Sequence, residues 1–297
     1  MAYRIRHRDR TAGHALRRIA REQINAALAC IDDGAGDAST TIHAVRKRCK
    51  KVRGLLRLVR PALADDPAGN AAFRAIAAPL GPLRDADVLI ETFEQLAKSC
   101  RTDEAALFAS LRPGLDRHRT DVEASHDPDA LLRDARDALD ATLPDIDRWR
   151  LAHDGFAAFE DGLKTAYRRG RKAMRAARRS DDDEAFHTWR KRCKDHAFHL
   201  RLFEPVWPGP MRAQRRCADA LGETLGLHHD LAVLAARLRT LPDADPAALD
   251  ALTVCIDARQ RTLAGRADTL GARLFAEPPR ALATSWRRRY AAWRRDA

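Results

Sequence analysis

IHAVRKRCKKVRGLLRLV, residues 42–59, recurs later in the chain as FHTWRKRCKDHAFHLRLF, residues 186–203. Placed on a helix at about 100° per residue, each copy has apolar side chains along one side and only basic residues or histidine along the other. This periodicity predicts an amphipathic helix. Its repetition indicates a chain built from two related helical halves.

Two further echoes occur in the same order in both halves. LGPLRDADVL (80–89) resembles LGLHHDLAVL (225–234), and basic residues share a 4-3-4 spacing in 10–21 and 164–175. Chance explains one short match, but not easily three in register. We therefore predict two homologous helical bundles in tandem, residues 1–145 and 146–297.

The composition favours helices throughout. Ala, Leu and Arg are abundant and are good helix formers, whereas alternating runs of β-branched and aromatic residues are missing, so strands are not expected. Prolines 79 and 82 should interrupt the helix they fall in, and the boundary between the halves is expected within 142–154. The predicted helices span about 11–32, 40–61, 103–125, a shorter stretch after Pro128, 155–179, 183–204, 210–240, 246–275 and 280–295.

The charge indicates an anionic partner. The 297 residues carry a formal net charge of +12, with a pI near 10. A surplus of this size is typical of proteins that bind nucleic acid, a membrane surface or polyphosphate. The alternative is a soluble basic protein whose basic faces meet acids of neighbouring helices.

The cysteines and the hydropathy pattern indicate the compartment. The six cysteines, Cys100 among them, are scattered without a C-x-x-C pair, which predicts reduced core thiols and not disulfides or zinc ligands. The first residues lead into no apolar signal segment, and no run of about 18 apolar residues predicts a membrane span. We expect a cytoplasmic protein, and no pattern specifies its oligomeric state.

The repeated helices carry candidate ligand residues of one sign. No acid occurs from residue 43 through 60. Like-charged neighbours on a helix cost a few tenths of a kcal/mol each, and a polyanion would relieve that repulsion because Lys supplies a point charge and Arg a planar fork for phosphate oxygens. The candidates are His43, Arg46, Lys47, Lys50, Arg53, Arg57 and Arg84, then His187, Arg190, Lys191, Lys194 and Arg201, with the fainter stripes His14, Arg17, Arg21 and Lys164, Arg168, Arg171, Arg175.

Motifs for catalysis are absent. The sequence contains no P-loop, dinucleotide fingerprint or nucleophile elbow. Asp85 and Asp230 recur in the second echo, and we interpret them as first-turn carboxylates or as orienting partners of an arginine. The prediction is therefore a protein that is not an enzyme, with no cofactor and no metal.

At these residues the sequence resembles the CHAD family, the conserved histidine α-helical domain. The resemblance rests on H-x-x-R-K-x-x-K, present from His43 to Lys50 and from His187 to Lys194, and on the two segments of the second echo. It covers nearly the whole chain. It implies two four-helix bundles related by a pseudo-twofold axis, a basic groove or pore between them, and binding of inorganic polyphosphate, with association with polyphosphate granules.

The second copy departs from the first at two basic positions. Ala197 stands where the first copy has Arg53, and Asp195 stands where it has Lys51. The second stripe is therefore the weaker one, and the ligand path is expected to be asymmetric.

Two rival functions share part of this pattern. Nucleic-acid binding shares the electrostatics but predicts aromatic platforms beside the basic residues, and the stripes contain few aromatics. A phosphoryl-hydrolysing or phosphoryl-transferring enzyme would need metal-binding carboxylates beside the stripes. Polyphosphate is the preferred partner, and nucleic acid is the alternative.

Overall fold

The computed structural model describes residues 3–34, 36–64, 69–98, 105–180, 182–242 and 244–296, most of which are helical. The all-α class is confirmed: within these ranges no strand forms, and Leu63 and Leu151 make only an isolated bridge. The first half contains α1 (Ala12–Asp32), α2 (Ala38–Val59), the 3₁₀ helix η1 (Arg60–Ala62), α3 (Gly69–Ala77), α4 (Gly81–Ala97), α5 (Ala105–Ser125), α6 (Pro128–Ala141) and α7 (Leu143–Arg148). The second half contains α8 (Ala157–Ser180), α9 (Asp183–Phe203), the 3₁₀ helix η3 (Glu204–Val206), α10 (Pro208–Leu238), α11 (Pro246–Leu274) and α12 (Pro279–Arg295).

The helix ends follow local signals in the sequence. The side chains of Thr11, Asp37, Asp127, Asp182 and Asp245 each accept a hydrogen bond from a backbone N–H in the first turn of the helix that follows. The break predicted at the two prolines is the join between α3 and α4. The short helix α7 lies in the predicted boundary segment, and both Cys100 and the predicted helix start at 103 lie outside the described residues.

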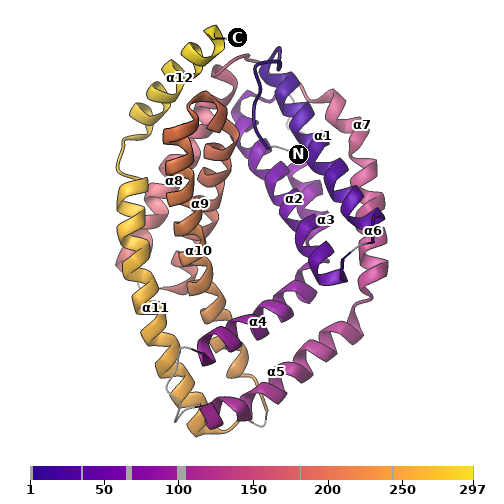
Figure 1. The fold of residues 1–297 in the computed structure, drawn as a ribbon, viewed down its shortest axis with the longest axis vertical. Helices are drawn as coiled ribbons and strands as arrows, with labels where there is room; N and C mark the ends of the chain where they lie inside the picture. Colours follow the sequence, from indigo (N-terminus) through magenta and orange to yellow (C-terminus); the bar gives the residue numbers. More distant parts are fainter. Residues whose placement is uncertain are drawn as a thin grey trace.

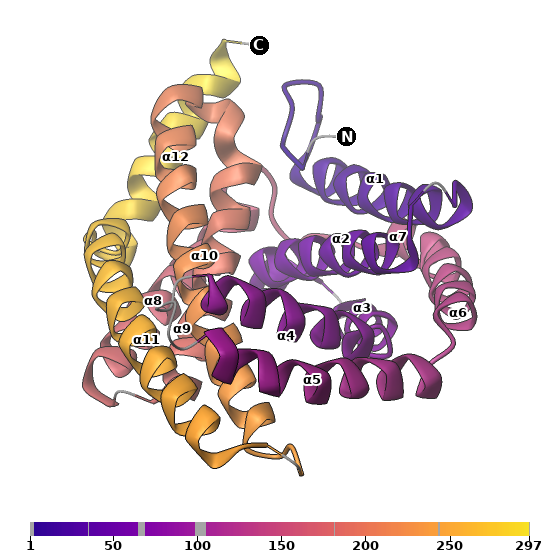
Figure 2. The same ribbon diagram turned by 60° about the horizontal axis from the view of Figure 1, so that its bottom comes forward.

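The helices form two groups that meet at both ends (Figure 1). In this view α1, α2, α3, α6 and α7 lie on one side and α8 to α12 on the other. Helices α4 and α5 leave the first group and run side by side toward the second, where α4 packs against α10 and α5 against α11 (Figure 2). Helix α2 also packs directly against α8 and α9.

Both hydrophobic cores contain side chains from the two sequence halves. The larger core joins residues such as Leu16 and Leu58 to Phe159 and Phe203. The smaller one joins Phe93 and Phe108 to residues of α10 and α11. The halves predicted at 1–145 and 146–297 therefore pack as partners, while their pseudo-twofold relation stays a prediction.

Two glycines allow the halves to approach closely. Gly162 of α8 lies against the backbone of α2, where a Cβ atom would overlap the carbonyl oxygen of Leu58. A Cβ atom at Gly54 of α2 would lie 2.9 Å from Cδ2 of Phe198 in α9. These contacts fix where α2 crosses the second half.

Replacing Gly162 tests the α2–α8 contact. Gly162→Ala should lower the free energy of unfolding by about 2 kcal/mol or more, because the clash is with backbone and cannot be relieved by a rotamer change. Chemical denaturation measures the change. Gly265→Ala in α11 is the matched control: nothing lies within 4 Å of its Cβ position, so a gain of about 0.5–1 kcal/mol is expected. Equal effects at both sites would contradict the close packing.

Two buried histidines couple the core to pH. His196 and His199 of α9 are 1% exposed, and the His196 ring packs on Tyr167 and Trp286 at centroid distances of 5.1 and 6.1 Å. Burial lowers the pKa of each to about 3; the neighbouring His199 adds to the shift at His196, and Arg57 adds to that at His199. Both side chains therefore stay neutral in the folded protein at neutral pH.

Acid should destabilise the fold through this pair. The unfolded chain takes up protons at these histidines below about pH 6.5 and the folded chain does not, so stability falls as the pH drops from 6.5 toward 3. Each histidine should contribute a loss of about 2 kcal/mol between pH 8 and pH 5. Urea denaturation at the two pH values measures the loss, and His196→Phe should reduce it. An unchanged pH dependence in that variant would contradict the assignment.

Candidate functional site

Basic side chains from four helices converge between the two halves. We call this set the central cationic cluster. The cluster consists of His43, Arg46 and Lys50 of α2, Arg84 of α4, His187, Arg190 and Lys194 of α9, and His229 of α10. The acids Asp85, Glu91 and Asp230 lie around this cluster.

Lys50 shows that the two repeated stripes face each other. Its side chain is exposed, yet loss of hydration among the surrounding protein atoms is the main cause that lowers its pKa to about 8. The charges of Arg46, Arg190 and Lys194 lower it further. Cations of the second repeat therefore lie close enough to Lys50 to act on its charge.

The same unit of an arginine, an aspartate and a glycine recurs in each half. Arg46 lies 3.7 Å from Asp85, and a Cβ atom at Gly81 would lie 3.0 Å from the Arg46 guanidinium. In the second half Arg190 lies 3.8 Å from Asp230 and packs against Gly226. The second sequence echo thus supplies the partners of the first, and the interpretation of the two aspartates as orienting partners of an arginine fits.

The two aspartates also lie near each other. Burial raises the pKa of Asp230, against the opposing charges of Arg190, Lys194 and Arg84, and the charge of Asp85 adds to the increase. Charged groups from both halves therefore act on the carboxylate of Asp230. The acids neutralise only part of the positive charge.

The histidines differ between the halves. Burial lowers the pKa of His43, and the charges of Arg84 and Lys47 lower it further. In the second half His187 stacks on His229 with ring centroids 3.8 Å apart, and burial followed by the charge of His187 lowers the pKa of His229 to about 4. Arg84 and His229 occupy equivalent positions, so the first half keeps a permanent cation where the second has a titratable one.

Other predicted residues lie at the edge of this cluster or outside it. Lys47 is exposed without an ion pair in the described chain, and Lys191 lies 3.7 Å from Glu184. Arg53 donates to Asn70 Oδ1 at 3.4 Å. Arg57 forms an ion pair with Asp195, and Arg201 has no ion-pair partner among the described residues.

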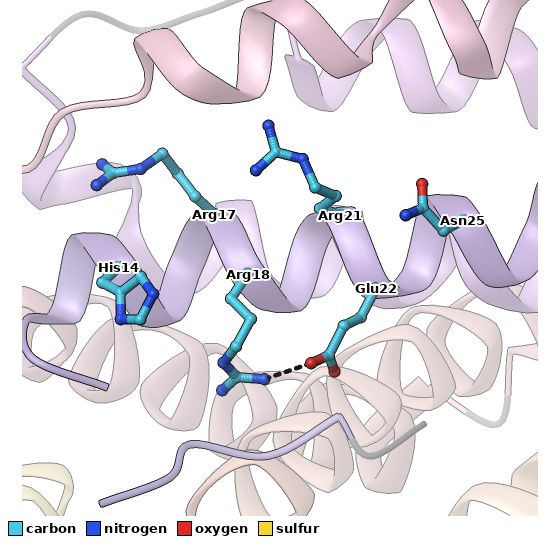
Figure 3. A pocket seen from close by; sticks show the side chains of 6 residues that line it. All are labelled: His14, Arg17, Arg18, Arg21, Glu22 and Asn25. Carbon is cyan, nitrogen blue, oxygen red and sulfur yellow. Dashed lines mark hydrogen bonds and ion pairs between the residues drawn. The ribbon is translucent and has the colours of Figure 1, made fainter. Parts of the chain in front are cut away.

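The basic stripe of α1 faces a separate shallow pocket (Figure 3). His14, Arg17 and Arg21 line it together with Arg18, Glu22 and Asn25. Arg17 donates to the carbonyl oxygen of Trp149 at 3.0 Å, and Arg21 pairs with Asp147 at 2.7 Å. These arginines therefore contact α7 and the chain after it.

The stripe of α8 is also partly occupied. Lys164 lies 2.7 Å from Asp161 and Arg168 donates to Thr165 Oγ1 at 3.4 Å. Arg171 is half-buried, and Arg175 is exposed. Helices α1 and α8 pack against α2 and α9, respectively.

The part of the chain that the structure describes holds no trio of His, Cys, Asp or Glu side chains arranged to bind a metal ion. No described helix is long and apolar enough to cross a membrane. Cys30, Cys49, Cys193 and Cys217 are free thiols, and burial, the largest cause, raises the pKa of Cys49 to about 11.

Removing two facing lysines should stabilise the protein when no ligand is present. Lys50→Met plus Lys194→Met removes two crowded charges, so the free energy of unfolding should rise by up to about 1 kcal/mol at low salt. The gain should shrink at high salt, where repulsion is screened. Denaturation at two ionic strengths measures it, with Lys98→Met plus Lys172→Met as an exposed-lysine control. A gain no larger than the control's would mean that the stripes do not face each other.

Comparison with known proteins places this fold. The structure of PptA from Streptomyces chartreusis matches with a TM-score of 0.61 at 16% identity, covering 89% of this chain and 99% of that one. The CHAD domain from the plant Ricinus communis matches with a TM-score of 0.55 at 22% identity, covering 89% and 90%. A search of curated proteins gave no match.

These structural similarities establish the fold. The family assignment comes from the sequence: the CHAD domain family matches residues 18–239, a span that contains the whole central cationic cluster. Since this is well over half of the sequence, the chain belongs to the CHAD domain family.

Proposed function

We propose that the protein binds inorganic polyphosphate across the central cationic cluster. The observation that carries the proposal is the environment of Lys50, whose pKa is lowered to about 8 by loss of hydration and then by cations of both halves. Such crowding is unfavourable until an anion enters. Binding of polyphosphate by some members of the CHAD family supports the same ligand.

A linear polyanion suits this arrangement better than a single small anion. The cluster extends over helices of both halves, and two of its arginines, Arg46 and Arg190, are already oriented by Asp85 and Asp230. A chain of phosphates can contact several cations at once and release its counterions to the solvent, which makes binding favourable and dependent on salt. Charge neutralisation along the chain would supply most of the affinity.

Nucleic acid is the second candidate, and the aromatic residues argue against it. Binding of single strands without sequence preference uses aromatic side chains on which bases stack. Phe186 and Trp189, which lie beside the second stripe, are buried. Trp207 is 45% exposed, but it belongs to the start of α10 and stacks under Arg289.

We further propose that the protein binds its ligand without hydrolysing it, and that it associates with polyphosphate granules in the cell. Incubation with polyphosphate and Mg²⁺ tests the first point: phosphate release above a heat-denatured control would indicate an enzyme. Microscopy of a fluorescent fusion in cells that accumulate polyphosphate tests the second point.

The two facing lysines provide the main binding test. Lys50→Gln plus Lys194→Gln should weaken polyphosphate binding about tenfold or more, and should reduce the slope of log affinity against log salt by roughly 1.4, because two phosphate contacts are lost. Fluorescence anisotropy with labelled polyphosphate measures both quantities, and circular dichroism checks that helicity is retained.

A charge-matched variant and a competitor make this test specific. Lys98→Gln plus Arg133→Gln removes the same charge from exposed positions outside the cluster, and its affinity should change less than twofold. An equal loss in both variants would reduce the effect to overall charge. If single-stranded DNA displaces polyphosphate at equal phosphate concentration, the choice of polyphosphate over nucleic acid fails.

A further inference from the structure

Helices α2 and α9 touch at equivalent positions of the repeat. A Cβ atom at Gly54 would lie 2.9 Å from the Phe198 ring, and Gly54 aligns with Phe198 when residues 42–59 are superposed on 186–203. Two equivalent helices that meet at equivalent residues place the side chains around the contact in matched pairs. A residue one turn after the contact on one helix faces a residue one turn before it on the other.

On one side of the contact this geometry produces an ion cluster that contains an acid. Arg57 of α2 pairs with Asp195 of α9, and Arg192 lies 3.6 Å from the same carboxylate. Asp195 is 7% exposed. Two arginines thus share one buried acid.

On the other side the acid is replaced by a base. Lys51 occupies the position equivalent to Asp195, Arg201 that of Arg57, and Arg48 that of Arg192. Lys51 is 5% exposed. Burial is the main cause that lowers its pKa to about 8, and the charges of Arg48, Arg201 and Lys47, which lie close enough to act on it, lower it further.

These cations lack an acidic partner. Within the described ranges neither Lys51 nor Arg201 has a carboxylate within 4.0 Å, and Arg48 donates only to the amide oxygen of Gln23, at 3.0 Å. The neighbouring Tyr3 donates its hydroxyl proton to the Lys51 carbonyl oxygen at 3.2 Å and packs on Phe198. The N-terminal segment therefore lies beside Lys51 and contributes no negative charge there.

We propose that Lys51, Arg201 and Arg48 form a second anion site, which binds a phosphate group where the other side of the contact holds the Asp195 carboxylate. The local charge favours a ligand with more than one negative charge, because Lys51, Arg201 and Arg48 lack a carboxylate beside them and Lys47 adds a further positive charge nearby. A phosphate group carries about −1.5 to −2 at pH 7 and accepts the bidentate hydrogen bonds that arginine donates.

This site is distinct from the central cationic cluster. Lys51 and Lys50 are consecutive on α2 and so point about 100° apart around the helix. The charges that act on Lys50 come from Arg46, Arg190 and Lys194, whereas those that act on Lys51 come from Arg48, Arg201 and Lys47. The inference therefore does not depend on the proposed function.

Thermal unfolding in potassium phosphate and in potassium chloride, at equal ionic strength and pH 7, tests the proposal. Orthophosphate should raise the Tm of the wild-type protein by roughly 2–4 °C when it is present at about ten times its Kd. Lys51→Asp should melt higher than wild type in chloride, because the introduced carboxylate would pair with Arg201, and phosphate should not raise its Tm further. Lys51→Met should also lose the phosphate-dependent rise in Tm, and this variant introduces no new ion pair with Arg201.

The variant Lys50→Gln plus Lys194→Gln locates the effect. If this variant keeps the phosphate-dependent rise in Tm, the ion binds at Lys51 and not in the central cationic cluster. A rise lost in this variant but kept in both Lys51 variants would overturn the proposal, as would the absence of any rise in the wild type with orthophosphate and with polyphosphate.

Thermal unfolding of the Lys51 variants with each ligand distinguishes the two sources of the phosphate group, free orthophosphate and polyphosphate. A Lys51-dependent rise with orthophosphate identifies the free ion as the ligand. A Lys51-dependent rise that appears only with polyphosphate identifies a phosphoryl group of the chain. Loss of polyphosphate affinity in the Lys50 and Lys194 variant concerns the proposed function alone, so the two hypotheses can fail independently.

Discussion

The close contact of α2 with the second half is the constraint on which the arrangement depends. Gly162 lets α8 approach the α2 backbone at Leu58, and Gly54 lets α9 approach through Phe198. These contacts bring the equivalent helices of the repeat together, so that two stripes separated by more than a hundred residues act on each other's charges. Side chains at these glycines would push the stripes apart.

The fold tolerates this concentration of charge because each half supplies a matched acid. The pairs of Arg46 with Asp85 and of Arg190 with Asp230 hold the guanidinium groups in place and reduce the repulsion between them. Burial nevertheless lowers the pKa values of Lys50 and Lys194, although Asp85 opposes the change at Lys50 and Asp219 and Glu223 oppose it at Lys194. Orientation and excess charge are thus divided among different residues, and the surplus is left for an external anion.

Much of this arrangement could be predicted from the sequence, because helices carry their period and their ends locally. The amphipathic spacing and the prolines located most of the helices, and the repeat identified the cationic stripes. The sequence did not reveal that α1's arginines contact Trp149 and Asp147, or that α4 and α5 complete a core with α10 and α11. Those contacts depend on packing between distant segments, which no local period records.

The departures between the two copies are as informative as their agreement. The exchange of Lys51 for Asp195 weakens the second stripe when it is viewed as sequence, yet in the structure neither residue belongs to the central cluster. Both lie at the contact between α2 and α9, where one side contains its own anion and the other contains only cations. The exchange of Lys51 for Asp195 therefore concerns the contact between α2 and α9, and the asymmetric ligand path stays a prediction. Charge in a repeat has to be assigned to a face of the folded helix before it is assigned to a ligand.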